Sequence, residues 1–456
     1  MKYDAIIIGS GQAGNPLSRE LADLGWTVAL LERAHLGGTC INTGCTPTKT
    51  MVHRAQVAHY ARHAARWGVR SGQIDVDLES IVRQKDHIVQ SFRDGLQRQV
   101  DRRPNLRLYR GQARFVSPHR LEVGEHLLES EKIFIDTGAR PLIPTIPGLD
   151  RVDYLTNESI MGLTRLPAHL VVLGGGYVGL EFGQMFRRFG SRVTVIHNSE
   201  QILPREDPEV AAELQKALAT EGVDFLLGAR TTAIEKKEGS IILTVEGNQG
   251  LSTVTGSNIL VATGRLPNSD DLGVDKAGIE IDKKGFIKVN GRLETNVPGI
   301  WALGDVKGGP AFTHISYNDF QIVYGNLVKG RGLSVDNRIV PYCVFTDPQL
   351  GCTGMTEKEA RAKGYQLKIG KIPMTGVARA LERDETAGLM KIVVDATNDH
   401  ILGASLLCPE AGELVQILVA LMLANQPYTL LKEAIYIHPT LAEGFFSLME
   451  DVKPVK

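Results

Sequence analysis

The feature that most constrains the fold is a glycine-rich turn that occurs twice, each time between an apolar run and a helical pattern. Residues 5–8 (AIII) precede residues 9–14 (GSGQAG), and residues 170–173 (LVVL) precede residues 174–179 (GGGYVG). In a strand–turn–helix unit, such glycines let the backbone approach a pyrophosphate, which the N-terminus of the helix then faces. The chain is therefore predicted to contain two dinucleotide-binding units of the α/β type.

The first unit carries an acid at the position expected for a ribose contact. Its second strand covers residues 28–31 and ends at Glu32, eighteen positions after Gly14. A carboxylate there accepts hydrogen bonds from the ribose hydroxyls of a bound nucleotide. The alternative is an ordinary strand–helix–strand turn without a ligand. The glycines, the flanking elements and the acid together favour a nucleotide site formed by Gly9, Gly11, Gly14 and Glu32.

The second unit lacks that acid. Eighteen positions after Gly179 stands His197, followed by Asn198 and Ser199. A carboxylate would repel a 2′-phosphate, whereas His197 and Ser199 can donate hydrogen bonds to one, with help from Arg205. The unit is therefore predicted to bind NADPH in preference to NADH. The alternative is that His197 only ends a strand and that Glu200 or another group contacts the ribose.

Two cysteines stand five positions apart in the glycine-bracketed segment 37–49 (GGTCINTGCTPTK). Five residues of straight helix rise about 7.5 Å, which exceeds the spacing of about 4.4–6.8 Å that a disulfide needs between its Cα atoms. A distorted turn can close that distance, and Gly44 supplies the freedom for one. Cys40 and Cys45 are interpreted as a redox pair, with two unrelated buried thiols as the alternative.

The residues after the cysteines predict one amphipathic helix that carries both thiols near its N-terminal end. Met51, Ala55 and Ala58 recur at helical spacing, and a helix N-terminus lowers the pKa of a thiol. His59 and His63 lie one turn apart, which suits a metal ligand pair, but we expect them to be solvated and predict no metal site. Further along, a second helix is expected within 71–104, followed by strands at 107–116, 121–128 and 131–138.

Composition sets limits on the partners. The chain has 456 residues, enough for about three domains at roughly 100–200 residues each. A net charge of −1 gives no broad attraction to nucleic acid or to a membrane surface. The first residues lack the pattern of a signal peptide, and the longest apolar run, around 414–424, is too short to cross a bilayer. Five cysteines do not make a disulfide scaffold, so a cytoplasmic location is predicted.

Two nucleotide units and one cysteine pair have a direct chemical meaning. One unit holds a flavin and the other a pyridine nucleotide. Hydride passes to the flavin, and electrons pass from the flavin to the disulfide, with the protein orienting the cofactors. We therefore expect a flavoprotein oxidoreductase that uses FAD and NADPH.

The chain resembles the pyridine nucleotide–disulfide oxidoreductases, the family of glutathione reductase, dihydrolipoyl dehydrogenase and mercuric reductase. The resemblance runs from end to end and rests on residues 9–14, 38–49, 174–181, 262–267, 301–305 (WALGD) and 438–443 (HPTLAE). It implies two Rossmann-like dinucleotide-binding domains, for FAD and NAD(P), and a C-terminal α+β dimerisation domain. The implied boundaries are 1–147 and 268–338 for the two parts of the FAD domain, 148–267 for the NAD(P) domain, and 339–456 for the dimerisation domain.

The resemblance also implies roles for single residues. Cys45 is the flavin-facing thiol that forms a charge-transfer complex, and Cys40 is the interchange thiol that meets the substrate. Lys49 and Glu181 form the ion pair near the flavin. His438 and Glu443 are the base and its orienting acid, delivered from the partner subunit of a homodimer. The implied FAD contacts are Gly9, Gly11, Gly14, Glu32, Gly38, Thr39, Lys49, Ala113, Thr137, Gly138 and Asp305, and the implied NAD(P) contacts are Gly174, Gly176, Tyr177, Gly179, His197 and Gly264.

Within the family, residues 40–50 and 304–313 are most similar to mercuric-reductase-like flavoproteins and to the reactive-chlorine-resistance flavoprotein, a copper(II) reductase. Against a true mercuric reductase, the tail 451–456 lacks a cysteine pair, and His438 stands where those enzymes commonly have tyrosine. The expected acceptor is a soft metal ion, Hg(II) or Cu(II), or a small disulfide. The alternatives are a dihydrolipoyl dehydrogenase or glutathione-type reductase, and then a soluble transhydrogenase or a flavin redox sensor with little turnover.

Overall fold

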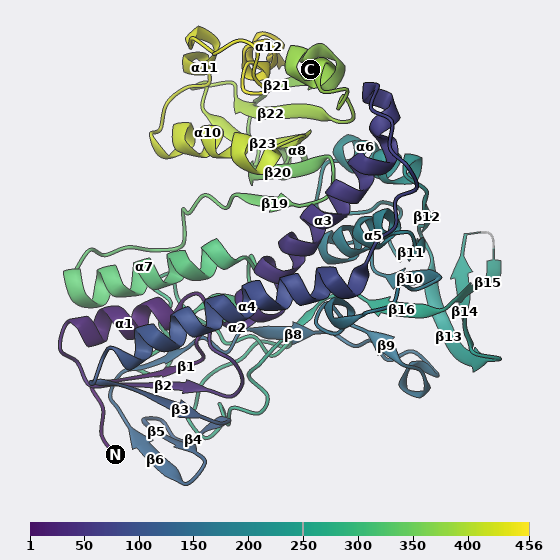
Figure 1. The fold of residues 1–456 in the computed structure, drawn as a ribbon. Helices are drawn as coiled ribbons and strands as arrows, with labels where there is room; N and C mark the ends of the chain where they lie inside the picture. Colours follow the sequence, from purple (N-terminus) through teal and green to yellow (C-terminus); the bar gives the residue numbers. More distant parts are fainter. Residues whose placement is uncertain (249, 456) are drawn as a thin grey trace.

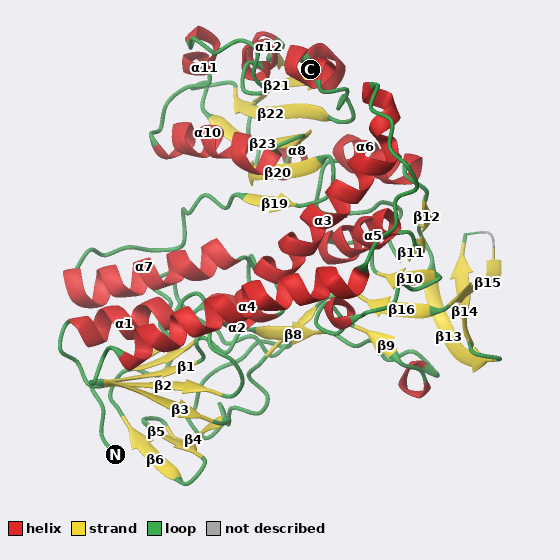
Figure 2. Cartoon of the chain, in the orientation of Figure 1, coloured by secondary structure: helices red, strands yellow, loops and turns green. Residues whose placement is uncertain are grey.

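The computed structural model describes residues 1–248 and 250–455, and Figures 1 and 2 show its arrangement. A sheet of five parallel strands, in the order β18-β7-β1-β2-β3, forms the N-terminal part. Its strand β1 is buried along its whole length, as is usual for a parallel strand covered on both faces. The strands are β1 (Ala5–Ile8), β2 (Val28–Glu32), β3 (Leu106–Arg110), β7 (Ile133–Ile135) and β18 (Ile300–Ala302).

Helices cover one face of this sheet and a small antiparallel sheet lies near the other (Figure 1). The covering elements are α1 (Gly14–Asp23), α2 (Gly38–Asn42), α4 (Leu78–Asp101) and α7 (Thr313–Lys329). Helix α3 (Cys45–His63) packs against α4 and against α5 (Tyr177–Phe189) of the second unit, and the 3₁₀ turn η1 (Ala64–Trp67) follows it. The small sheet has the order β4-β5-β6, with β4 (Ala113–Ser117), β5 (Arg120–Val123) and β6 (His126–Glu129). The strands expected at 107–116 and 121–128 each break into two, because Gly111 and Gly124 adopt positive φ angles between them.

The second unit repeats the pattern. Its five-stranded parallel sheet has the order β12-β11-β10-β16-β9, and a three-stranded antiparallel sheet, β13-β14-β15, lies beside it. Two short antiparallel strands, β8 and β17, pair where the chain enters and leaves this unit. The elements are β8 (Ala139–Pro141), η2 (Leu149–Arg151), β9 (Tyr154–Leu155), η3 (Ile160–Gly162), β10 (His169–Leu173), α5 (Tyr177–Phe189), β11 (Arg192–Ile196), α6 (Pro208–Thr220), β12 (Val223–Leu226), β13 (Arg230–Lys237), β14 (Ser240–Gly247), β15 (Gly250–Gly256), β16 (Asn258–Val261) and β17 (Arg265–Pro267).

The C-terminal part is a six-stranded antiparallel sheet with helices packed against it, drawn in green and yellow in Figure 1. The strand order is β19-β20-β23-β22-β21-β24. After η4 (Gly304–Lys307), the elements are β19 (Tyr342–Val344), β20 (Gln349–Gly354), α8 (Glu357–Ala362), β21 (Leu367–Pro373), η5 (Met374–Gly376), α9 (Ala378–Glu382), β22 (Leu389–Asp395), β23 (Ile401–Cys408), α10 (Ala411–Leu423), α11 (Thr429–Glu433), α12 (Gly444–Glu450) and β24 (Lys453–Pro454).

The predicted fold class, two Rossmann-like units and a C-terminal α+β domain, is confirmed. Pairing of β18 with β7 shows that the chain returns to the first sheet after building the second unit. The residue boundaries given for the domains stay a prediction. Among the described residues, no helix has both the length and the apolar character that crossing a bilayer requires.

One prediction about a helix is wrong. The cysteines were expected on a single helix, but α2 ends at Asn42 and α3 begins at Cys45. Between them Gly44 adopts φ −131° and ψ −116°, outside the helical region. A Cβ atom at Gly44 would lie 2.8 Å from the Thr39 carbonyl oxygen. The break folds the two cysteines toward each other, which a straight helix cannot do. The apolar face of α3 forms as expected, with Met51, Ala55 and Ala58 buried.

We expect Gly148→Ala to lower the free energy of unfolding by about 2 kcal/mol or more. Gly148 adopts φ 85°, and a Cβ there would lie 1.9 Å from the Ile234 carbonyl oxygen. Gly239 adopts a similar φ of 81° with open space around it, so Gly239→Ala isolates the backbone effect. Thermal unfolding of both variants tests this, and equal losses would contradict a steric origin.

Candidate active site

The break between α2 and α3 brings the Cys40 thiol of α2 close to that of Cys45, the first residue of α3. Both cysteines are free thiols, with Cys40 half-buried and Cys45 exposed at the surface of the single chain. The Cys45 Sγ lies 3.0 Å from the Thr313 Oγ1 at the first residue of α7. The adjacent Cys40 thiol, the Thr313 hydroxyl and the Lys49 ammonium together lower the pKa of Cys45, although partial desolvation by neighbouring atoms opposes that shift. Cys45 is therefore the thiol that ionises first.

Cys40 has the opposite electrostatics. Its interaction with Cys45, together with its burial, raises the pKa of the Cys40 thiol. Two neighbouring thiols cannot easily both ionise, so one proton is shared between them. The pair can therefore hold one thiolate and one thiol at neutral pH, which is the state that a dithiol nucleophile needs.

An ion pair joins α3 to α5 directly behind the thiols. The Lys49 Nζ lies 2.5 Å from the Glu181 Oε2, and the Glu181 side chain is 5% exposed. The second carboxylate oxygen of Glu181 accepts a hydrogen bond of 2.8 Å from the Phe345 amide. The Phe345 ring also lies 4.6 Å from the Lys49 Nζ, within the range of a cation–π contact. Three segments far apart in the sequence thus meet at one buried carboxylate.

A cavity of about 440 Å³ follows the first glycine-rich turn. Its lining includes seven of the residues predicted to contact FAD, namely Gly9, Gly11, Glu32, Gly38, Thr39, Ala113 and Thr137. The turn leaves no room for side chains, since a Cβ at Gly9 would lie 2.2 Å from the Asp136 carbonyl oxygen and one at Gly38 would lie 2.8 Å from the Gly11 Cα. This backbone cradle, with Glu32 beside it, fits the pyrophosphate and ribose of a dinucleotide.

The remaining predicted FAD residues lie around this cavity. The Gly14 amide donates a hydrogen bond of 2.7 Å to the Asp136 carboxylate, which is buried and whose pKa is raised by that burial. Gly138 follows Thr137 with φ 68°. Asp305 is the second residue of the η4 turn, and its carboxylate lies 3.6 Å from the Arg265 guanidinium. Burial raises the pKa of Asp305, and the Arg265 charge opposes that shift.

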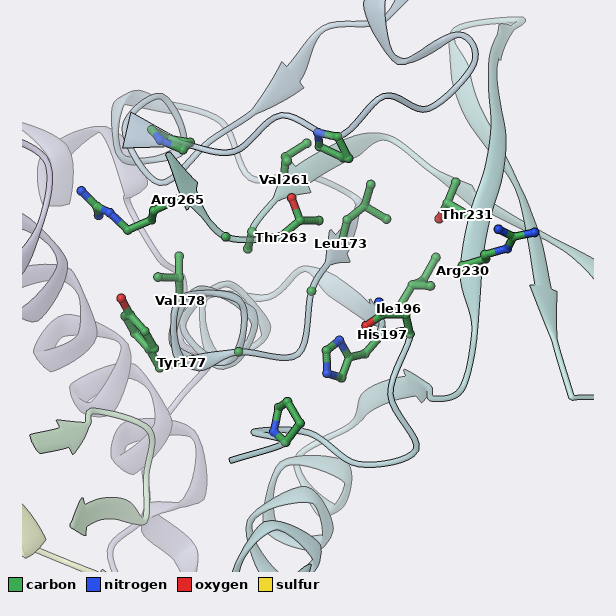
Figure 3. Close-up of a pocket in the computed structure, with 18 of the residues that line it drawn as sticks. Leu173, Tyr177, Val178, Ile196, His197, Arg230, Thr231, Val261, Thr263 and Arg265 are labelled. Atoms are coloured by element: carbon green, nitrogen blue, oxygen red, sulfur yellow. The ribbon is translucent and has the colours of Figure 1, made fainter. Parts of the chain in front are cut away.

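A second cavity, of about 580 Å³, follows the second glycine-rich turn (Figure 3). It is lined by five of the six residues predicted to contact NAD(P), namely Gly174, Gly176, Tyr177, His197 and Gly264. The sixth, Gly179, lies behind the turn, where a Cβ would meet the Gly174 carbonyl oxygen at 2.0 Å. Figure 3 shows Tyr177 at one end of the cavity and His197 and Arg230 toward the other.

The polar groups at the His197 end are basic. The buried Nε2 of His197 has no hydrogen-bond partner within the described chain, and burial lowers the pKa of this imidazole. Arg205 and Arg230 also line the cavity. The alternative ribose contact, Glu200, is held elsewhere, because its carboxylate accepts hydrogen bonds of 3.2 and 3.4 Å from the Asn248 amide. The cavity therefore offers donors and cations to a nucleotide rather than a carboxylate.

His438 and Glu443 contact each other but not the cysteines. The His438 Nδ1 lies 3.0 Å from both Glu443 carboxylate oxygens, and the histidine side chain is 67% exposed. Their loop, between α11 and α12, lies at the outer end of the C-terminal domain, away from α2 (Figure 1). A carboxylate on one ring nitrogen fixes the imidazole orientation and leaves the other nitrogen free for proton transfer.

Of the other histidine pair, His63 is exposed as predicted, whereas His59 is less exposed than predicted. His59 is half-buried, its ring centroid lies 4.3 Å from that of His63, and its Nδ1 lies 3.8 Å from the Glu221 carboxylate. Burial, with the nearby Arg188 charge, lowers the pKa of His59 to about 4, so it is neutral at pH 7. Within residues 1–248 and 250–455, no three metal-ligating side chains are grouped together.

The sequence did not predict the contacts that three residues make in this site. The Thr313 hydroxyl forms a hydrogen bond with the Cys45 thiol, Phe345 contacts both members of the ion pair, and Arg265 lies beside Asp305. Thr313 is 268 positions from its partner cysteine, and Phe345 is 164 from Glu181. No local spacing rule reaches that far, although Thr313 and Arg265 both stand in segments that carried the family resemblance.

The chain matches two family models in sequence order. Residues 3–319 match the pyridine nucleotide-disulphide oxidoreductase family, and residues 340–448 match the dimerisation domain of pyridine nucleotide-disulphide oxidoreductases. The two matches cover both nucleotide units and the antiparallel C-terminal sheet described above.

Individual relatives are similar over nearly the whole chain. The probable pyridine nucleotide-disulfide oxidoreductase RclA of Escherichia coli is 38% identical over 99% of this chain and 100% of that protein. A mercuric reductase of Lysinibacillus sphaericus is 34% identical over 97% of this chain and 81% of that protein. A dihydrolipoyl dehydrogenase of Thermus scotoductus is 36% identical over 98% of this chain and 97% of that protein.

A solved structure agrees with these sequences. The Cu(II) complex of the HOCl-induced flavoprotein disulfide reductase RclA from Escherichia coli has a TM-score of 0.91 at 37% identity, covering 99% of this chain and 100% of that one. The predicted family, and its relation to both mercuric reductases and the copper-associated flavoprotein, are confirmed. With its FAD and NAD(P)H cofactors and its C-terminal dimerisation domain, the chain belongs to the pyridine nucleotide-disulfide oxidoreductases.

Proposed function

We propose that this oxidoreductase passes electrons from NADPH to a soft metal ion, Cu(II) or Hg(II), bound by Cys40 and Cys45. The observation that carries the proposal is the pair itself, two adjacent thiols of which Cys45 is the more acidic. Thiolates are the ligands that soft ions prefer. The flavin, when bound, accepts hydride from the nucleotide and supplies two electrons to the sulfur pair. The Cu(II) complex described for the RclA structure supports the same acceptor class.

The number of electrons that the sulfur pair gives up equals the number that the metal takes. For copper, the reduced pair gives up two electrons to two Cu(II) ions, which become two Cu(I) ions, and the sulfurs close to a disulfide. For mercury, one Hg(II) ion takes both electrons and leaves as Hg(0). Counted from two neutral thiols, either reaction releases two protons, of which the Cys45 proton is already lost when the pair holds one thiolate and one thiol. Lys49 stabilises the anionic form of Cys45 through its charge, and Glu181 holds Lys49 in place.

A second acceptor, a small disulfide, is favoured by the hydrogen-bonded pair of His438 and Glu443. His438 takes the proton of the Cys40 thiol, and the Cys40 sulfur then attacks one substrate sulfur. The S–S bond of the substrate breaks, and the other sulfur leaves as a thiol after taking that proton back from His438. The Cys45 thiolate then attacks the Cys40 sulfur. This step releases the second thiol and closes the Cys40–Cys45 disulfide, so one disulfide is reduced for each dithiol oxidised.

We infer that His438 and Glu443 serve the cysteine pair of a second copy of the chain. In one chain their loop and the exposed Cys45 belong to separate parts of the molecule (Figure 1). Two apolar side chains of the same loop are exposed, Ile435 at 102% and Ile437 at 79%. Burial of such residues favours association, and the family match to a dimerisation domain agrees with a homodimer.

The preference for NADPH is proposed from the basic end of the second cavity. His197, Arg205 and Arg230 line it, while Glu200 is engaged by Asn248. Arg230 forms an ion pair of 2.8 Å with Glu246, whereas no carboxylate within the described chain pairs with Arg205. A 2′-phosphate bound here would gain a charge-assisted hydrogen bond from Arg205.

We expect the two-electron-reduced holoenzyme to show the long-wavelength absorbance of a thiolate against flavin, and Cys45→Ser to abolish it. Because the pKa of Cys45 is lowered, the band should persist as pH falls past the ordinary thiol value of about 8.5 and disappear only at lower pH. Cys408→Ser, which changes a buried cysteine of β23 in the C-terminal domain, is the control. Retention of the band in Cys45→Ser would contradict the assignment of this thiol.

We expect His438→Ala to lower turnover with a disulfide acceptor by about 100-fold or more, because thiol exchange needs a proton donor. Metal reduction should change by less than about threefold, since no leaving thiol is protonated there. Steady-state NADPH oxidation with Cu(II), Hg(II), oxidised glutathione, lipoamide and quinones checks this and identifies the acceptor. His87→Ala, on the exposed face of α4, is the matched control. Equal losses with metals and disulfides would remove the proposed distinction.

We expect the wild-type enzyme to have a higher kcat/KM with NADPH than with NADH. Arg205→Met should lower the NADPH value about tenfold, because one charge-assisted hydrogen bond to phosphate is lost, and should change the NADH value by less than about twofold. Arg192→Met, which removes another exposed arginine of the same unit, is the control. Equal or better use of NADH by the wild-type enzyme would overturn the cofactor assignment.

A further inference from the structure

The loop that carries Arg205 has an unfavourable backbone conformation. It runs from β11 to α6 and contains Leu203 at φ 46°, a region that branched L-residues rarely adopt. The Leu203 amide donates a hydrogen bond of 3.0 Å to the Gly175 carbonyl, inside the glycine-rich turn. Pro204 and Arg205 follow and line the nucleotide cavity. Such a conformation persists only where the surrounding contacts hold it.

The next two residues of the loop are held by the C-terminal domain. The Glu206 carboxylate accepts a hydrogen bond of 2.5 Å from the Tyr342 hydroxyl of β19, and the Cys352 thiol lies 3.4 Å away. The Asp207 carboxylate, 4% exposed, lies 2.8 Å from the Lys391 Nζ of β22. The loop of residues 197–207, called the cofactor loop below, therefore contacts the glycine-rich turn on one side and the antiparallel sheet on the other.

Lys391 contacts several carboxylates at once. Its side chain is 2% exposed, and its ammonium lies within 2.8 Å of three carboxylates, Asp207, Glu209 and Glu357. Burial alone would lower the pKa of Lys391, but the three carboxylates outweigh burial and raise it to about 12. The lysine is therefore charged at neutral pH and compensates the buried Asp207. Two of its partners, Asp207 and Glu209, stand where the cofactor loop ends and α6 begins.

We propose that Lys391 is a positioning residue for the pyridine nucleotide. It fixes Asp207 and Glu209, and through them it holds Leu203 in its left-handed conformation and the Arg205 guanidinium at the cavity. This inference rests on the proposed contact of Arg205 with a 2′-phosphate. Lys391 itself touches no nucleotide group. Its effect is expected on the 2′-phosphate and not on the parts of the nucleotide shared by NADP and NAD.

Loss of the lysine charge would leave like charges close together. In Lys391→Met, Asp207 and Glu209 lose their shared cation, while Glu357 keeps Arg361 at 2.7 Å. A buried carboxylate without a cation is unfavourable, so the start of α6 would shift toward water. Leu203 could then relax to an ordinary backbone conformation, and Arg205 would leave the cavity. The glycine-rich turn, on the other side of the loop, would remain in place.

The test is equilibrium binding of NADP⁺, NAD⁺ and 2′,5′-ADP to the FAD-loaded protein by calorimetry. We expect Lys391→Met to raise the Kd for NADP⁺ and 2′,5′-ADP about tenfold, the loss of one charge-assisted hydrogen bond, with the Kd for NAD⁺ within about twofold of wild type. Tyr342→Phe removes only the hydroxyl on Glu206 and should shift the same two constants in the same direction. The matched control is Lys368→Met on the neighbouring strand β21, which breaks a partly buried ion pair with Asp399 in the turn after β22.

Three results would overturn the inference. One is wild-type affinity for 2′,5′-ADP in Lys391→Met. Another is an equal loss of NADP⁺ and NAD⁺ binding, which indicates general damage to the unit. If Lys391→Met does not fold, Tyr342→Phe decides, and unchanged constants in that variant reject the proposal. A wild-type protein that binds NADP⁺ no more tightly than NAD⁺ would reject the cofactor assignment itself, whatever the variants do.

Discussion

The arrangement of the site depends on the ion pair between Lys49 and Glu181. Lys49 comes from the helix that begins at Cys45, and Glu181 comes from the first helix of the second nucleotide unit. Because Glu181 is buried, removing its cation would leave an uncompensated charge, at about 3–5 kcal/mol for a broken buried pair. The Phe345 amide on the same carboxylate brings in the C-terminal domain. One interaction therefore links the sulfur pair, both nucleotide units and the domain that follows.

The two nucleotide units share a backbone design and differ in charge. In both, the third glycine packs against the carbonyl oxygen of the first, since a Cβ at Gly14 or Gly179 would lie 2.2 or 2.0 Å from that oxygen. The first cavity has the Glu32 carboxylate beside the turn, and the second has His197 with arginines. The same fold thus presents an acceptor to one ribose and donors to the other. This difference underlies the proposed preference of the second site for NADPH.

The C-terminal domain acts on both neighbouring parts. Its helical end exposes Ile435 and Ile437 beside the pair of His438 and Glu443, a surface that a second subunit would cover. Its sheet holds the cofactor loop of the second unit through Lys391. The C-terminal domain therefore also contacts, through buried charge, the loop that is proposed to contact the nucleotide.

The sequence by itself determined the local chemistry: the two glycine turns, the acid at Glu32 and its absence at His197, and the close cysteine pair. These depend on spacings of a few residues, which strand and helix geometry fix in advance. The residue-level roles carried by the family resemblance, such as that of His438, were expectations of a different kind and stay predictions.

Sequence periodicity misplaced the helix start, because the Gly44 backbone and the Thr39 carbonyl interrupt a pattern that side chains alone would continue. Only the tertiary structure decided that Thr313 contacts Cys45, that Phe345 contacts the ion pair and that Lys391 contacts Asp207. Those contacts join residues more than 160 positions apart, and their geometry follows from how separate sheets pack, which no local pattern encodes.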